Sequence, residues 1–137
     1  MKDSLLRLAA RLNVAERVHF VGWQLDVPRL LAASDLVLLT SRWEGMPNIL
    51  LEAMAAARPI VTTDVHGAWE LLGSAAQLQM TPKADSKAFV DAVIRIGSDS
   101  AIAARLGAQN QKRAASVFSM NQMMAAYIKL YDSILGR

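Results

Sequence analysis

The sequence predicts an α/β domain built on a largely parallel sheet. Short β-branched runs alternate with helical stretches as far as Thr81, and the residues after it read as helices alone. The run DLVLLTS at 35–41 is mostly apolar, which is typical of a parallel strand buried on both faces. Strands that alternate with helices favour βαβ units. We therefore expect an α/β part over residues 1–81 and a helical tail over 82–137.

The first elements follow from local patterns. Residues 3–12 (DSLLRLAARL) repeat apolar positions at helical spacing, which predicts a helix. VHFVG at 18–22 is a short β-branched run closed by glycine, which predicts a strand. Pro28 suits the first turn of a helix over 28–33, because proline has no N–H and its φ is already helical. The strand at 35–41 comes next.

The middle of the chain continues the alternation. A helix is expected over 47–57 with Pro47 at its first position, followed by PIVTTD at 59–64 as a second buried strand. A short helix at 68–72 precedes AQLQM at 76–80, the weakest of the predicted strands. Three helices close the chain, at 85–97, 99–117 and 119–135, with Ser86, Asp99 and Ser119 as their expected caps.

Composition excludes several classes of function. The chain has 137 residues, of which 53% are hydrophobic and 20% charged, and this suits one packed domain. It has no cysteine, which rules out disulfides, thiolate catalysis and cysteine metal sites. His19 and His66 are far apart in the sequence and do not form a metal-ligand pair. The net charge of +3 comes without a basic run, so we expect no nucleic-acid groove.

The location of the protein is predicted from two absences. No apolar run reaches the roughly 18 residues that a membrane-spanning helix needs. The first residues, MKDSLLRLAARLNV, carry charges within a helical pattern, unlike a signal peptide. We therefore expect a cytoplasmic protein, and peripheral association with the inner face of the membrane stays open.

The candidate site lies where parallel strands end, because ligands of open parallel sheets bind beyond the carboxyl ends of the strands. Segments 22–24, 41–48 and 63–67 would lie there. In the middle segment Pro47 fixes the start of a helix, and Gly45 lets a ligand approach the backbone. Free amides at a helix N-terminus attract phosphate, and the donors here would be those of Met46, Asn48 and Ile49.

Glu52 stands inside the same helix with apolar neighbours, and a buried carboxylate costs several kcal/mol unless it is hydrogen-bonded. A ribose diol, the protein's own backbone or an arginine would satisfy it. Alternatively, Glu52 is exposed or forms a structural salt bridge, and Glu44 is a solvated loop acid. Single residues do not decide between these interpretations.

The stretch EGMPNILLEAMAAARPIVTTDVHGAWELL resembles the donor-binding signature of retaining glycosyltransferases of the GT-B fold, in the large family 4 group. That signature has a Glu, seven residues and a second Glu, then a small-residue helix, a proline-led strand and a Gly-containing loop ending in Glu. The matching positions are Glu44, Glu52, Pro59, Asp64, Gly67 and Glu70. RVHFVGW, LLAASDLVLLTS and RAASVFSMNQMMAAYIKLYDSIL extend the resemblance over nearly the whole chain. It implies a Rossmann-like parallel sheet with flanking helices, from the C-terminal half of such an enzyme.

The resemblance also implies the role of each site residue. Glu44 would be the catalytic residue beside the transferred sugar, and Glu52 would bind the ribose. The donor sugar and diphosphate would meet the backbone at Gly45, Met46, Asn48 and Ile49, and the nucleobase would lie near Trp23 and Gln24. The family generally needs no metal cofactor, because a helix terminus and basic side chains neutralise the diphosphate.

The chain departs from the family pattern in several places. Ala57 stands near a position that is usually glycine, and His66 replaces the first residue of a common Gly-Gly pair. The Arg and Lys that hold the diphosphate, the first two strands and the acceptor-binding domain have no counterpart, so we expect an N-terminally truncated version. In the strand order 3-2-1-4-5-6 the absent strands separate 18–22 from 35–41, which predicts exposed apolar edges.

Two functions stay open at this point. The first is the donor-binding part of a retaining glycosyltransferase that uses a nucleotide sugar and meets a glycan or lipid-linked acceptor through the missing domain. The second is a catalytically incomplete fragment that acts as a binding module, or associates with another copy through its unpaired strands. The methionine-rich segment MNQMMAAYIKLY would suit such a partner surface. The spacing of Glu44 and Glu52 disfavours a third possibility, a nucleotide-sugar epimerase.

Overall fold

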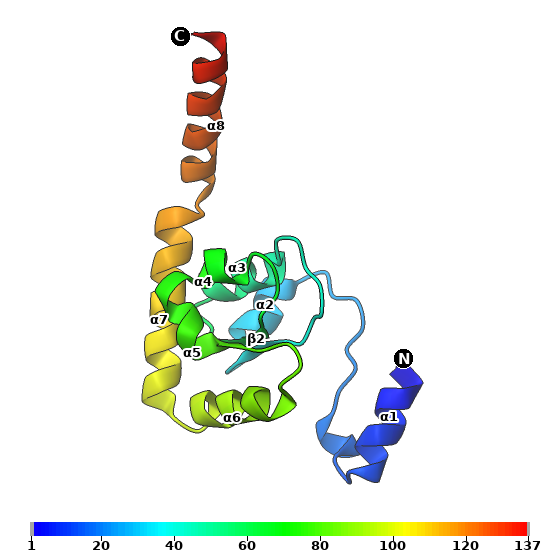
Figure 1. Cartoon of the computed structure of the whole chain (residues 1–137). Coiled ribbons are helices and arrows are strands. Elements are labelled where there is room, and N and C mark those ends of the chain that lie inside the picture. Colours follow the sequence, from blue (N-terminus) through cyan, green and yellow to red (C-terminus); the bar gives the residue numbers. More distant parts are fainter. Residues whose placement is uncertain (1, 137) are drawn as a thin grey trace.

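A computed structural model describes residues 2–136 and contains a three-stranded parallel sheet (Figure 1). Its strands are β1 (Val37–Leu39), β2 (Ile60–Thr63) and β3 (Met80–Thr81), in the order β1-β2-β3. Val37 pairs with Ile60, and Thr62 pairs with Met80, all in parallel register. The predicted α/β class with a parallel sheet is therefore confirmed.

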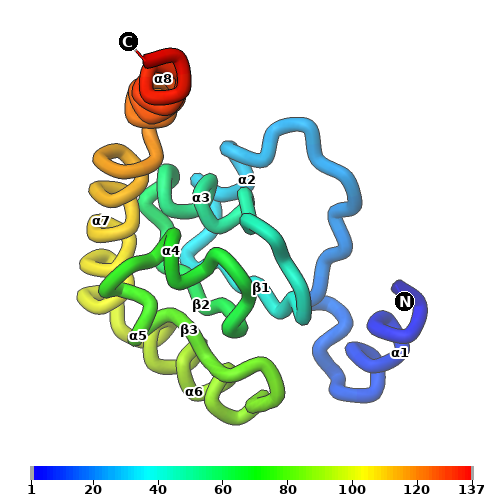
Figure 2. Tube along the Cα trace, turned by 45° about the horizontal axis from the view of Figure 1, so that its top comes forward, coloured from blue at the N-terminus to red at the C-terminus, as the bar shows by residue number. Residues whose placement is uncertain are grey.

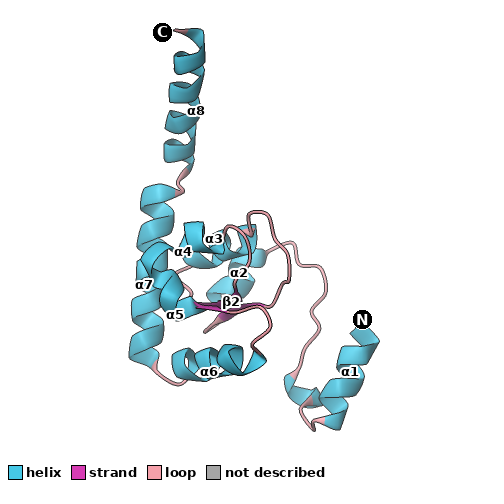
Figure 3. Cartoon of the chain, viewed as in Figure 1, coloured by secondary structure: helices cyan, strands magenta, loops and turns pink. Residues whose placement is uncertain are grey.

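Helices cover both faces of the sheet, as Figure 3 shows. They are α1 (Lys2–Arg11), α2 (Val27–Ala32), α3 (Asn48–Ala55), α4 (Ala68–Leu72), α5 (Ala76–Gln79), α6 (Ser86–Gly97), α7 (Ser100–Val117) and α8 (Met120–Leu135). Short 3₁₀ turns lie at Ala15–Arg17 and Gly73–Ala75. Helices α2, α3 and α4 lie on one side of the sheet and α6 on the other, while α7 packs along the flank against both α3 and α6 (Figure 1).

Helix starts follow side-chain capping. Asp99 accepts from the amides of Ala101 and Ile102, and Ser119 accepts from that of Gln122, so both predicted caps are confirmed. The prediction of Ser86 is wrong by one residue. Asp85 caps α6 instead, accepting from the amide of Ala88 at 2.8 Å.

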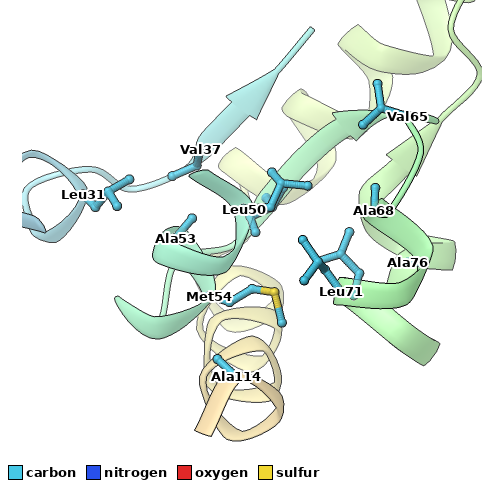
Figure 4. Close-up of a cluster of buried hydrophobic side chains, with 12 residues drawn as sticks. Leu31, Val37, Leu50, Ala53, Met54, Val65, Ala68, Leu71, Ala76 and Ala114 are labelled. Carbon is cyan, nitrogen blue, oxygen red and sulfur yellow. The ribbon is translucent and has the colours of Figure 1, made fainter. Parts of the chain in front are cut away.

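The core consists of two apolar clusters, one on each face of β2. The larger lies between the sheet and α2, α3, α4, α5 and α7 (Figure 4). The smaller joins Val61 to Ala92 and Ile96 of α6 and Leu106 of α7. All four residues of β2 are buried, since each face is covered by helices.

Two predicted strands are wrong. Residues 18–22 contain no strand, and Val21 is 54% exposed, because the segment has no neighbouring strand to pair with. Residues 76–79 form α5, and only Met80 and Thr81 pair with β2. Ile60 and Val61 of β2 therefore have no described strand neighbour on the side of β3.

A buried amide pair takes the place of the missing strand. The side-chain oxygen of Gln79 accepts from the amide of Ile60 at 2.8 Å. Gln79 and Asn110 exchange two hydrogen bonds of 2.9 Å, and Asn110 also donates to the carbonyl of Arg58 at 2.9 Å. Both side chains are fully buried. This network fastens α7 to the start of β2.

The strand β1 has a free edge. Its one described neighbour is β2, and Leu38 is 49% exposed, so the prediction that 35–41 is buried on both faces is wrong for this strand. The cause is the lack of any described strand on its outer side. Figures 1 and 2 also show α1 and α8 standing away from the packed body, and every residue of α8 is exposed.

The end of α3 carries a left-handed alanine. Ala57 has φ +56°, its amide donates to Met54, and the amide of Arg58 donates to Ala53, which together form a Schellman motif. A non-glycine residue in this conformation costs about 1–2 kcal/mol.

We therefore expect Ala57→Gly to raise the free energy of unfolding by up to about 1 kcal/mol, the lost strain being partly offset by the greater freedom of glycine in the unfolded chain. Urea denaturation measures the change. The control is Ala56→Gly, whose φ of −78° any residue adopts and which should destabilise instead. Equal losses in both variants would contradict the strain at Ala57.

Candidate functional site

Three loops meet at the carboxyl edge of the sheet. Residues 40–47 follow β1, 64–67 follow β2 and 82–85 follow β3, and parallel strands bring these loops to one side. Two hydrogen bonds join them. The hydroxyl of Thr63 donates to the carbonyl of Ser41 at 2.6 Å, and the amide of Asp64 donates to the carbonyl of Thr81 at 2.8 Å. The predicted segments 41–48 and 63–67 are thus neighbours.

The first loop presents a carboxylate beside free backbone donors. Glu44 is half-buried, Gly45 is exposed and Met46 is 47% exposed. Within residues 2–136, the amides of Met46, Asn48 and Ile49 donate to no protein acceptor. Three unpaired donors next to an acid suit a ligand that carries both an anionic group and hydroxyls.

Pro47 lies one position earlier in the helix than predicted. It is the N-cap of α3, with φ −76° and ψ 90°, and Asn48 is the first helical residue. The extended ψ of Pro47 turns the chain from the loop into the helix. Pro47 itself is buried, so the start of α3 is held firmly against the body.

Glu52 is exposed, and the expectation of a buried acid is wrong. Helix α3 buries Leu50, Ala53 and Met54, which form one stripe at helical spacing. Glu52 follows Leu50 by two residues, about 200° around the helix, and therefore faces away from the core. Among the described residues its carboxylate has no hydrogen-bond or ion-pair partner, which leaves it open to a ligand.

The two residues predicted to lie near the nucleobase make their described contacts away from this edge. Trp23 is 89% exposed, and the side chain of Gln24 donates to the carbonyl of Val21 in its own segment at 2.6 Å. Within the described part of the chain, no hydrogen bond or ring contact joins either residue to the loop of Glu44. The structure therefore brings Glu44 and the free amides together, and leaves Trp23 and Gln24 outside the group.

Sequence reasoning missed a cation at the same edge. Lys83 follows β3, and its Nζ lies 5.0 Å from the centroid of the Trp43 ring, next to Glu44 in the chain. A cavity of about 270 Å³ opens beside it, lined in part by Thr40, Thr63 and Lys83. The rule that ligands bind beyond strand ends would have found Lys83 had the strand been placed at 80–81.

Within 2–136, no cluster of three or more His, Asp or Glu side chains could hold a metal ion. Over the same range, no helix combines the length and the apolar character needed to cross a bilayer.

The chain is similar to glycosyltransferases of lipopolysaccharide core biosynthesis. It is 31% identical over 132 residues to the lipopolysaccharide core biosynthesis glycosyltransferase LpsE of Rhizobium meliloti, and 32% identical over 136 residues to the lipopolysaccharide core biosynthesis mannosyltransferase LpsB of the same organism. These matches cover 96% and 98% of the chain. The chain spans 39% of the length of each relative.

A solved structure gives the same picture of the fold. Anabaena HepE, crystallised in complex with UDP, superposes with a TM-score of 0.81 at 28% identity, over 93% of this chain and 36% of HepE. The fold class of a GT-B glycosyltransferase is thereby confirmed. Residues 1–99 match the family of glycosyl transferases group 1. Since that match takes in 72% of its residues, the chain belongs to the glycosyl transferases group 1 family.

Proposed function

We propose that the chain is the nucleotide-sugar donor-binding part of a retaining glycosyltransferase, which transfers a hexosyl group from an NDP-sugar to a glycan or a lipid-linked acceptor. The observation that carries this proposal is the group of free amides at Met46, Asn48 and Ile49 beside Glu44. The UDP complex of HepE supports a nucleotide ligand, and the names of LpsE and LpsB support a glycan acceptor.

The proposed chemistry breaks the bond between the anomeric carbon and the diphosphate oxygen and forms one to an acceptor oxygen. The nucleoside diphosphate leaves with the bonding electrons, and the acceptor hydroxyl gives up its proton to the leaving diphosphate oxygen. The amides of Met46, Asn48 and Ile49 would bind the sugar and the leaving diphosphate, whose charge grows in the transition state. Glu44 would contact the hydroxyls of the transferred sugar.

Glu52 would accept hydrogen bonds from the ribose diol. Its exposed carboxylate is four residues after Asn48 and so lies on the same face of α3 as the Asn48 side chain, about one turn from the helix start. Charge-assisted hydrogen bonds to a diol are stronger than neutral ones, and an unpartnered carboxylate has its acceptors free. The nucleobase would lie near Trp23 and Gln24, provided the segment of these residues closes towards the edge.

Two further parts of the proposal rest on the family resemblance. The reaction would use no resident metal cofactor, and Lys83 would supply positive charge at the edge where the diphosphate lies. The protein would work in the cytoplasm, at the inner face of the membrane when its acceptor is lipid-linked.

Titration calorimetry with UDP and with uridine tests the proposal. If the loop amides hold the diphosphate, UDP binds at least about tenfold more tightly than uridine, since charge-assisted hydrogen bonds contribute about 1.5–3 kcal/mol each. GDP in place of UDP reports the preference for the nucleobase. Equal affinity for UDP and uridine would contradict the role of the amides.

A second candidate function, an interaction module, is favoured by the free edge of β1. An unpaired edge with an exposed apolar residue is a template for pairing with another strand. We propose that the isolated chain self-associates there, or pairs with a fuller glycosyltransferase.

Leu38→Lys is expected to reduce this association, because a lysine at the edge opposes pairing. Analytical ultracentrifugation over a range of concentrations measures the monomer fraction, which should rise in the variant. Ile94→Lys on the exposed face of α6 is the matched control. Monomers in both wild type and variants would refute pairing through β1.

A further inference from the structure

We propose that Gly67 is a positioning residue of the donor site, which holds the peptide between Gly45 and Met46 with its N–H turned towards the ligand. This inference rests on the proposed function, because the ligand is the diphosphate or sugar of the donor. It adds a residue from the loop after β2 to a site that otherwise consists of the loop after β1 and the start of α3.

The two loops touch at Gly67 more closely than any side chain would allow. A Cβ atom on this residue would lie 2.8 Å from the carbonyl oxygen of Gly45, 3.3 Å from Cδ of Pro47 and 3.4 Å from Sδ of Met46. Real Cβ contacts do not fall below 3.0 Å. Gly67 also has φ +80°, which disfavours any residue with a Cβ.

This contact fixes the direction of a backbone donor. The carbonyl of Gly45 faces Gly67, and in a planar trans peptide the C=O and the following N–H point in opposite directions. The N–H of Met46 therefore points away from the loop after β2. It donates to no protein acceptor within residues 2–136, so its hydrogen bond is free for a ligand.

The loop after β2, which contains Gly67, is held in place on both sides of this residue. Before it, the amide of Asp64 donates to Thr81, and Val65 is 2% exposed. After it, Ala68 is fully buried, and the guanidinium of Arg113 donates to the carbonyls of Glu70 and Leu71 at 2.8 and 2.7 Å.

The loop after β1, on the other side of this contact, is less tightly packed at Gly45. Gly45 is exposed, and a Cβ built on it would meet nothing within 4 Å. A methyl group at position 67 would consequently displace the peptide between Gly45 and Met46, and the loop after β2 would stay in place. The N–H of Met46 would no longer point towards the ligand, while the fold would be unchanged.

Gly67→Ala tests this, with Gly136→Ala as the control for backbone strain alone. Gly136 follows the end of α8, has φ +67°, and a Cβ built on it would meet nothing within 4 Å. Both variants place an alanine at a left-handed position, but only Gly67→Ala changes the contact with Gly45.

Two readouts separate positioning from stability. In the ligand-free protein, amide NMR should show shifted resonances for Gly45 and Met46 in Gly67→Ala and unchanged ones in Gly136→Ala. In calorimetry with UDP, Gly67→Ala should bind at least about tenfold more weakly than wild type and Gly136→Ala within about twofold, a tenfold change being 1.4 kcal/mol.

The inference is overturned if Gly67→Ala leaves the Met46 resonance unchanged, or if both variants bind UDP equally well. A wild-type chain that binds no UDP would contradict the proposed function. The Met46 resonance would then still report whether Gly67 fixes this peptide.

Discussion

Asn110→Leu is expected to lower the free energy of unfolding by about 3 kcal/mol, because two buried polar groups each lose a hydrogen-bond partner. Asn110 is 1% exposed and donates to both the carbonyl of Arg58 and the side-chain oxygen of Gln79. In the variant that carbonyl loses its side-chain donor. The side-chain nitrogen of Gln79 keeps only a 3.5 Å contact with the carbonyl of Ala75.

Leucine has the branched shape of asparagine but a larger volume, so the loss comes from the broken hydrogen bonds and from overpacking and not from a cavity. Urea denaturation followed by circular dichroism measures it. Gln109→Leu is the control, since Gln109 is the exposed preceding residue of the same helix and should change stability by no more than about 0.5 kcal/mol. Equal effects at the two positions would show that the amide network adds nothing.

Gly107→Ala is expected to destabilise the protein by about 3 kcal/mol or to shift α7 outright. A Cβ at this position would lie 2.2 Å from the carbonyl oxygen of Ala57 and 3.1 Å from its carbonyl carbon. Both atoms are backbone, so no side chain can rotate away, and overpacking of this kind costs about 1–3 kcal/mol or more. The cost outweighs the gain of about 1 kcal/mol from a better helix former.

Gly97→Ala separates the clash from helix propensity. Gly97 is the last residue of α6, and a Cβ there would come no closer than 4.0 Å to Leu36. This variant should be neutral or slightly stabilising in the same denaturation experiment. If Gly107→Ala were also neutral, α7 would not pack against the end of α3 as described.

The parts of the fold that the sequence predicted depend on local patterns. Apolar runs at 35–41 and 59–64 gave the two principal strands, and Asp99 and Ser119 gave helix starts, because capping is decided within a few residues. The strand predictions for 18–22 and 76–80 are wrong for a different reason. A strand needs a partner, and neither the absence of one for 18–22 nor the inward turn of Gln79 is visible in a local pattern.

The candidate site was predictable in outline. The carboxyl-edge rule and the start of α3 located Glu44 and the amides that follow it. The apolar neighbours of Glu52 in the sequence leave open whether it is buried or exposed. The buried stripe of α3 through Leu50, Ala53 and Met54 decides for the exposed position. The contact of Gly67 with Gly45 joins separate loops, so only the folded chain reveals it.

The central claim is that this edge of the sheet binds a nucleotide sugar and that Glu52 holds its ribose. Titration calorimetry of UDP into wild type and Glu52→Ala tests both parts, with Glu16→Ala as a control at an exposed acid in the 3₁₀ turn Ala15–Arg17. Because Glu52 is exposed and unpartnered, its replacement should leave the thermal midpoint unchanged. We expect UDP binding by wild type and Glu16→Ala, and at least about tenfold weaker binding by Glu52→Ala, because a charge-assisted hydrogen bond is lost. Equal affinity of all three proteins for UDP, or no binding by a folded wild type, would contradict it.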